Sequence, residues 1–184
     1  MRRLAAALLL AATPALAADV AGVKVPESIV VDGMALQLNG AGIRTRTMFK
    51  VKVYVGALYV PRKTQDPGAI VALDQPKAIR LTLLRGVDRK SMLGALQEGF
   101  EKNSPSQLAE LLPKLKLLEP SLPDEAKEGQ VVPVTYVPGT GITFGVEGDK
   151  TVTVAGKDFA DAMFRVWLGP KPVDEDLKEA MLGK

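Results

Sequence analysis

The sequence of 184 residues contains no histidine and no cysteine. Without these residues the chain cannot build a Ser-His-Asp or Cys-His triad, a thiolate nucleophile or the usual zinc site. Disulfides are excluded as well, so the fold must be stabilised by packing alone. Any chemistry must use arginine, lysine, tyrosine, carboxylates, hydroxyl groups or bound water, and we expect neither a cofactor nor a metal site.

Long apolar runs are also missing, apart from a short one near the N-terminus. Residues 4–12 are apolar, follow two arginines and precede Ala15 and Ala17, which is the pattern of a secretory signal peptide with a small-x-small cleavage site. The run is shorter than the roughly 20 residues that a membrane-spanning helix needs. We therefore expect a signal peptide over residues 1–17, cleaved after Ala17 or one residue later, and a periplasmic or secreted protein without a membrane span. An uncleaved N-terminal anchor is the alternative.

The mature chain has little net charge. Removing Arg2 and Arg3 lowers the 24 basic residues to 22, against 21 acidic residues. A nucleic-acid-binding domain would carry a strong basic excess, so we expect no nucleic-acid partner. Residues 18–184 contain no internal repeat or linker and are long enough to bury a core as a single domain.

Hydrophobic periodicity predicts both strands and helices. The Asp32-Gly33 pair between two apolar runs is typical of a tight hairpin. Further strands are predicted over residues 78–84, 130–136, 142–146 and 151–154, and helices over residues 89–103, 104–118, 159–168 and 174–182. Pro113 is expected to kink or break the second helix. The pattern indicates one α+β domain with a helical layer on one face of an antiparallel sheet.

Residues 39–60 carry most of the candidate site. Gly40-Ala41-Gly42 is predicted to be a tight turn that opens a strand, because a phosphate-binding glycine loop would instead open a helix. Strict alternation predicts that one face of the following strand carries Phe49, Val51, Val53, Val55, Ala57 and Tyr59, and that the other carries Met48, Lys50, Lys52, Tyr54, Gly56 and Leu58.

Arg44, Arg46 and Tyr54 are the candidate binding residues of this stretch. A guanidinium can hold a carboxylate or a phenolate through two parallel hydrogen bonds. The alternative is that the two arginines are solvated cations at a sheet edge. Tyr54 shares its predicted face with Lys52, and a phenol near cations can act as an acid or a hydrogen-bond donor. The alternative for Tyr54 is plain packing under a helix.

The segment LNGAGIRTRTMFKVKVYVGALYV, together with the terminal AMFRVWLGPKPVDEDLKEAMLG, resembles the bacterial chalcone isomerase-like proteins. The GAG-x-R and WLG-x-x-PVD parts are the most specific. The resemblance implies an open-faced sandwich in which helices cover a large antiparallel sheet and a ligand cleft lies between them. The family includes plant enzymes that close a flavanone ring and fatty-acid-binding members with no known catalysis.

The resemblance also implies roles for single residues. Arg44 matches the arginine that steadies an anionic substrate or a fatty-acid carboxylate. The strand threonine of the catalytic members falls on Tyr54, and the late hydroxyl residue is either Thr151 or Thr153. The helix tyrosine and asparagine of the active enzymes have no match around residues 91–97, which read SMLGALQ.

Three hypotheses follow. The first is a periplasmic binding protein for a small elongated apolar anion, such as a fatty acid, in a cleft beside Arg44. Further ligand-binding candidates are Arg46, Lys52, Tyr54, Thr151 and Thr153. The second is an intramolecular lyase or isomerase acting on a phenolic enone, with Arg44 as electrostatic stabiliser and Tyr54 as proton donor. The third is an interaction protein whose cleft is filled by its own side chains.

Overall fold

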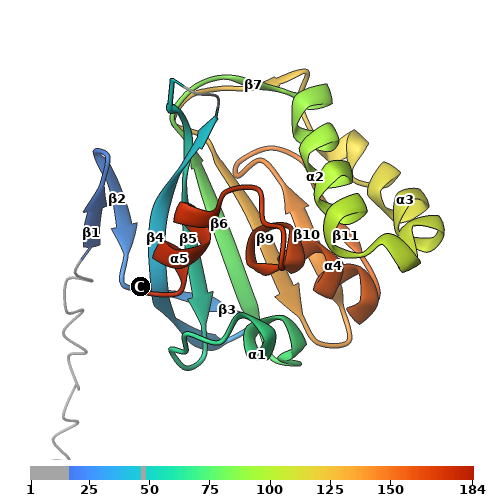
Figure 1. The fold of residues 1–184 in the computed structure, drawn as a ribbon, viewed down its shortest axis with the longest axis horizontal. Helices are drawn as coiled ribbons and strands as arrows, with labels where there is room; N and C mark the ends of the chain where they lie inside the picture. Colours follow the sequence, from blue (N-terminus) through green and yellow to red (C-terminus); the bar gives the residue numbers. More distant parts are fainter. Residues whose placement is uncertain (1–16, 47–48) are drawn as a thin grey trace, which may run out of the picture.

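The computed structural model describes residues 17–46 and 49–184 and shows helices packed on one face of a curled antiparallel sheet (Figure 1). Residues 1–16 of the predicted signal peptide, and Met48, lie outside the described residues. The main sheet has the strand order β11-β10-β9-β6-β5-β4-β3. Its strands are β3 (Ser28–Val31), β4 (Met34–Arg46), β5 (Val51–Val60), β6 (Lys77–Leu83), β9 (Val131–Val137), β10 (Gly141–Gly145) and β11 (Thr151–Val154).

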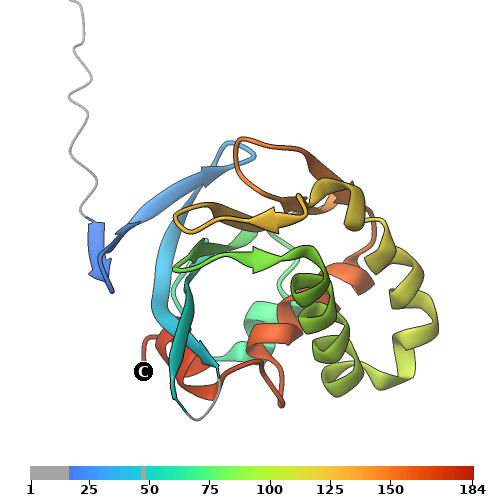
Figure 2. The ribbon, with the colours of Figure 1, turned by 90° about the horizontal axis from the view of Figure 1, so that it is seen from above.

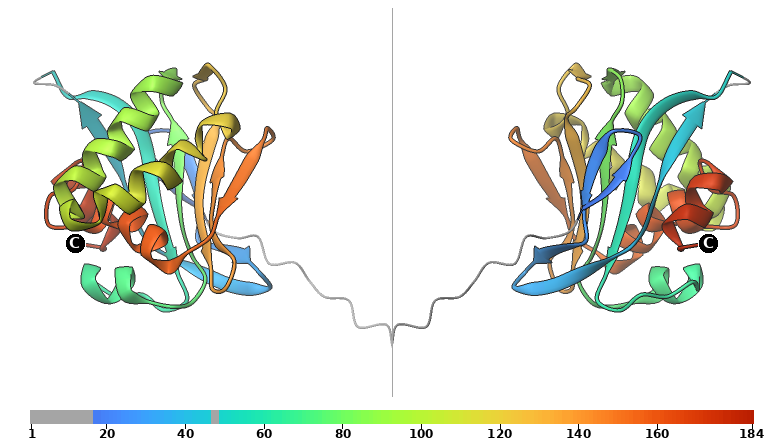
Figure 3. Two further views of the ribbon diagram at one scale, coloured as in Figure 1. Left: turned by 90° about the vertical axis from the view of Figure 1, so that its right-hand side faces the viewer. Right: turned by 90° about the vertical axis from the view of Figure 1, so that its left-hand side faces the viewer.

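The helices lie together on one side of this sheet (Figure 3). They are α1 (Pro67–Ala72), α2 (Arg89–Asn103), α3 (Leu108–Lys116), α4 (Lys157–Leu168) and α5 (Glu175–Met181), with 3-10 turns at Pro105–Gln107 and Glu119–Ser121. No described helix has the length and apolar character to cross a membrane. The predicted α+β fold with a helical layer on one face is confirmed.

Two short strand pairs complete the fold. β1 (Ala17–Val20) and β2 (Val23–Pro26) form a hairpin, and β7 (Val87–Asp88) pairs with β8 (Glu125–Ala126). Val25 of β2 packs with Leu36 and Tyr59 on the face of the sheet that the helices leave open. The Tyr59 hydroxyl donates a hydrogen bond of 2.9 Å to the Pro26 carbonyl. The hairpin therefore shields part of the second sheet face.

Several local predictions are confirmed by the backbone. Asp32 and Gly33 join β3 to β4 with φ angles of 50° and 75°, as a tight hairpin turn requires. Helix α2 covers the predicted residues 89–103, and Asp88 caps it, because its carboxylate accepts a hydrogen bond of 2.8 Å from the Ser91 N–H. The predicted break at Pro113 is wrong: α3 continues through it to Lys116, with Leu111 and Leu115 buried on either side of the proline.

The predicted turn at Gly40-Ala41-Gly42 is also wrong, because these residues lie inside β4. The glycines instead let α5 approach the sheet. A Cβ added at Gly40 would collide with the Ala180 carbonyl, and one at Gly42 would lie 2.5 Å from the Ala180 Cβ. Figure 2 shows β4 bending round toward α5, and Gly56 of β5 extends this flat surface beneath Met181. We call Gly40, Gly42 and Gly56 the glycine floor.

The strict alternation predicted for β5 fails at a β-bulge. Lys52 and Tyr54 pair with the consecutive residues Thr45 and Arg44 of β4, which leaves Val53 as the extra residue. Val51 and Val53 therefore face the helices together with Tyr54, whereas Val55, Ala57 and Tyr59 face the opposite side. β5 begins only at Val51, and Phe49 is 87% exposed in the preceding turn.

Substituting Gly42 by alanine is expected to destabilise the fold by about 1–3 kcal/mol, because the new methyl group meets the Ala180 Cβ in a packed interface. Ala180→Gly should cost about 1 kcal/mol on its own through helix propensity. The two costs should not add in the double variant, since removing the Ala180 methyl group relieves the collision. Urea denaturation of the four proteins measures this coupling. Strict additivity would contradict the proposed close approach.

Candidate functional site

An apolar cavity of about 320 Å³ lies between the sheet and the helices. Residues that line it from the sheet are Val51, Val53, Leu81, Leu83, Val132 and Phe144, and those from the helical side are Met92, Ala95, Leu96, Val166, Trp167 and Val173. The polar residues of the lining are Arg44, Arg46, Tyr54, Arg85, Asp88 and Ser91. The cavity therefore combines apolar volume with arginine side chains in its wall.

Arg44 and Tyr54 are neighbours across β4 and β5. The Arg44 Cζ lies 5.4 Å from the centroid of the Tyr54 ring, which is a cation–π geometry. The Arg44 Nε is shielded from water and has no hydrogen-bond acceptor, and Arg44 forms no ion pair within residues 17–46 and 49–184. A guanidinium with unused donors at an apolar cavity is suited to hold an anion.

Tyr54 connects the arginine to helix α4. Its hydroxyl oxygen accepts a buried hydrogen bond of 2.8 Å from the Trp167 Nε1–H. Burial raises the pKa of the Tyr54 phenol, and the charge of Arg44 and the hydrogen bond from Trp167 oppose that rise. The phenol is therefore neutral at physiological pH, and its own O–H remains available as a donor to a ligand.

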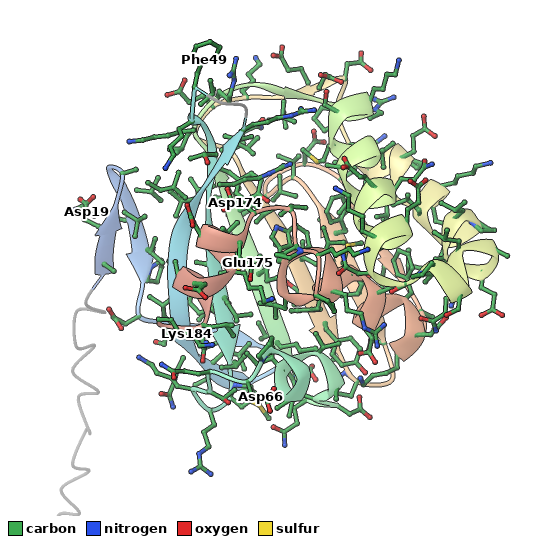
Figure 4. The ribbon with its side chains drawn as sticks, in the orientation of Figure 1. Asp19, Phe49, Asp66, Asp174, Glu175 and Lys184 are labelled. Carbon is green, nitrogen blue, oxygen red and sulfur yellow. The ribbon has the colours of Figure 1, made fainter. Side chains whose placement is uncertain are left out.

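Asp174 holds the strand next to Arg44 in place. Its carboxylate accepts hydrogen bonds from the Leu177 N–H at 3.0 Å and from the Thr45 N–H at 2.9 Å. The first bond caps α5, and the second ties the helix to β4 beside the bulge. Figure 4 shows Asp174 at the start of α5, where the helix meets the sheet.

Arg44, Arg46 and Tyr54 come together at the cavity, whereas the other candidates do not. Lys52 is exposed and does not line the cavity, because the bulge at Val53 turns it away. Thr151 and Thr153 are exposed on β11, the edge strand at the far side of the sheet. The Thr153 hydroxyl pairs with that of Thr143 at 2.9 Å.

Sequence reasoning missed Trp167, Arg85 and Ser91 as lining residues. Trp167 is the single tryptophan of the chain. Its indole N–H needed a buried partner, which was the available signal. Among the described residues no cluster of three acidic side chains is arranged to hold a metal ion.

Tyr54→Phe should destabilise the protein by about 1–3 kcal/mol near neutral pH, because the buried Trp167 N–H loses its acceptor. The pH dependence should change as well. A phenol whose pKa is raised in the folded state contributes stability that is lost above about pH 10, where the unfolded state releases its proton first. Tyr59, whose pKa burial raises to about 12, acts equally in both proteins.

Denaturant titrations between about pH 8 and pH 11 test this expectation. The wild-type protein should lose stability more steeply with rising pH than Tyr54→Phe. Equal slopes would show that the phenol is not protected from ionisation by the fold.

Comparisons with known proteins agree with this architecture. A solved structure of a fatty-acid binding protein from Arabidopsis thaliana has a similar fold, with a TM-score of 0.68 and 18% sequence identity over 88% of this chain and 92% of that chain. No match was found among curated protein sequences. The sequence pattern of the chalcone isomerase-like family matches residues 17–183. The predicted family is thereby confirmed, and the chain belongs to the chalcone isomerase-like family.

Proposed function

We propose that this protein binds a small elongated apolar anion, such as a fatty acid, with the acyl chain in the cavity and the carboxylate at Arg44. The observation that carries the proposal is a guanidinium with unused donors in the wall of an apolar cavity. Fatty-acid binding by the Arabidopsis protein of similar fold supports the same ligand class.

The size of the cavity limits the acyl chain. Its volume of about 320 Å³ is at the lower end of the range for ligand pockets in proteins, roughly 300–1,000 Å³. Each buried methylene contributes about 0.8 kcal/mol to transfer from water. A chain of medium length therefore fits the proposal better than a long one.

The polar lining of the cavity favours a carboxylate. Arg44 can donate two parallel hydrogen bonds to it, and charge-assisted bonds of this kind are stronger than neutral ones. The O–H of Tyr54, whose oxygen already accepts from Trp167, supplies a further donor at the same wall. We also propose that the protein is exported, on the signal-peptide pattern of residues 1–17.

The same residues bear on the alternative, an intramolecular lyase acting on a phenolic enone. Such an enzyme would use Arg44 as stabiliser and Tyr54 as proton donor. The raised pKa of the buried Tyr54 makes it a weak acid. Asp88, the one carboxylate among the described cavity-lining residues, is occupied at the start of α2 by bonds from Ser91. We therefore propose binding in preference to catalysis.

Arg44→Ala is expected to weaken dodecanoate binding by about 10- to 100-fold, because charge-assisted hydrogen bonds of about 1.5–3 kcal/mol are lost. Emission from Trp167, the only tryptophan, reports binding inside the cavity. Lys52→Ala is the matched control, since it removes a nearby cation that lies outside the cavity. Dodecanol, which lacks the charge, should bind Arg44→Ala and the wild-type protein alike.

Equal dodecanoate affinity in Arg44→Ala and the wild-type protein would refute the role assigned to Arg44. Absence of binding by the wild-type protein to fatty acids of any chain length would refute the proposed function itself.

Incubation with a chalcone tests the alternative directly. We expect ring closure, followed by ultraviolet absorbance, at the spontaneous rate, because no free acid–base pair faces the substrate. An acceleration that Arg44→Ala abolishes would instead establish the lyase.

A further inference from the structure

A polar groove of about 760 Å³ adjoins the cavity, and both spaces are lined by Arg44, Arg46, Asp88, Ser91, Ala95 and Val173. A ligand can therefore extend from one space into the other. The groove has more than twice the volume of the cavity, whereas a carboxylate held at Arg44 would occupy only its inner end.

The groove is strongly basic. Its lining holds five basic residues and two acidic ones: Arg44, Arg46, Lys90, Lys102 and Lys171, against Asp88 and Glu98. Glu98 is paired with Lys102 at 2.6 Å, and Asp88 accepts both the N–H and the hydroxyl of Ser91. The other four basic residues form no ion pair within the described part of the chain.

One negative charge does not match this arrangement. A carboxylate at Arg44 would leave Arg46, Lys90 and Lys171 with Asp88 as the only remaining negative charge among the described groove-lining residues, because Glu98 is paired with Lys102. A phosphate monoester carries about −1.5 to −2 charges at neutral pH and offers three acceptor oxygens. The first turn of the 15-residue helix α2, with Lys90 and Ser91, adds the positive end of the helix dipole to this wall.

We infer that the ligand is an acyl chain that carries a phosphate-bearing head group, with the chain in the apolar cavity and the head group in the basic groove. The inference rests on the proposed function and narrows its ligand class. Arg44, at the junction of the two spaces, would contact the polar atoms that link chain and head group.

The test compares four ligands with the same acyl chain: dodecanoate, dodecanoyl-glycerol, dodecanoyl-glycerol 3-phosphate and dodecanoyl-coenzyme A. Dissociation constants are measured by Trp167 emission in the wild-type protein and in Lys90→Gln/Lys171→Gln. The matched control is Lys127→Gln/Lys150→Gln, which removes the same charge from exposed lysines outside both spaces.

The wild-type protein should bind at least one phosphate-bearing ligand about tenfold or more tightly than dodecanoate or dodecanoyl-glycerol. Lys90→Gln/Lys171→Gln should lose most of this tighter binding, and its affinity for dodecanoate should stay within about twofold of the wild-type value. The control variant Lys127→Gln/Lys150→Gln should bind the phosphate-bearing ligand as tightly as the wild-type protein does. An advantage seen with only one of the phosphate-bearing ligands identifies the source of the head group. Added salt should reduce the advantage, because the groove is open to solvent.

A second variant tests the groove by shape. Gly94 lies in its wall, and a Cβ added there would meet nothing within 4 Å, so Gly94→Leu should fold and fill the space. Gly94→Leu should lower the affinity for the phosphate-bearing ligand and leave the affinity for dodecanoate unchanged. The inference would be overturned if the wild-type protein bound dodecanoate as tightly as both phosphate-bearing ligands. It would also be overturned if Lys90→Gln/Lys171→Gln and Gly94→Leu both still bound a phosphate-bearing ligand more tightly than dodecanoate. Binding of no acyl ligand at all would instead refute the proposed function.

Discussion

The approach of α5 to the glycine floor is the contact on which the rest of the site depends. It requires bare backbone at Gly40 and Gly42, and it brings Asp174 to the Thr45 N–H. At the other end of the helix, the Asn39 side chain donates to the Met181 carbonyl at 2.8 Å. The helix therefore fixes β4 on both sides of its centre, and Arg44 has a defined position before any ligand arrives.

The polar groups of the cavity differ in how many of their hydrogen-bond donors have a partner within the protein. The indole N–H of Trp167 is paired with the Tyr54 oxygen deep in the core, so its burial costs little, whereas the Tyr54 O–H remains available as a donor. The Arg44 Nε is a buried donor without an acceptor, which raises the free energy of the protein when the cavity is empty. An anion in the cavity would supply the missing acceptor. This contrast separates Trp167, which is paired within the cavity wall, from Arg44 and Tyr54, for which we propose contacts to the ligand.

The fold followed from local signals, whereas the choice of Arg44 as the anion-binding candidate came from the family resemblance. The Asp32-Gly33 turn and the Asp88 cap act within a few residues, so a single sequence reveals them. The glycine floor and the Trp167–Tyr54 bond depend on partners more than 100 residues away, which periodicity does not report. Thr151 and Thr153 were misplaced relative to the cavity for the same reason, because strand order, not spacing, puts β11 at the far edge.

The bulge at Val53 makes the cavity sensitive to chain length in an unusual place. Insertions and deletions are ordinarily tolerated in surface loops and harmful in strands. Here the extra residue sets which side chains of β5 face inward. Adding one residue to β4 opposite Val53 would remove the bulge, restore plain alternation in β5, turn Lys52 toward the cavity and turn Val51 away. An insertion of one codon, with no substitution among the lining residues, would thus place a charged side chain in a wall that is now apolar.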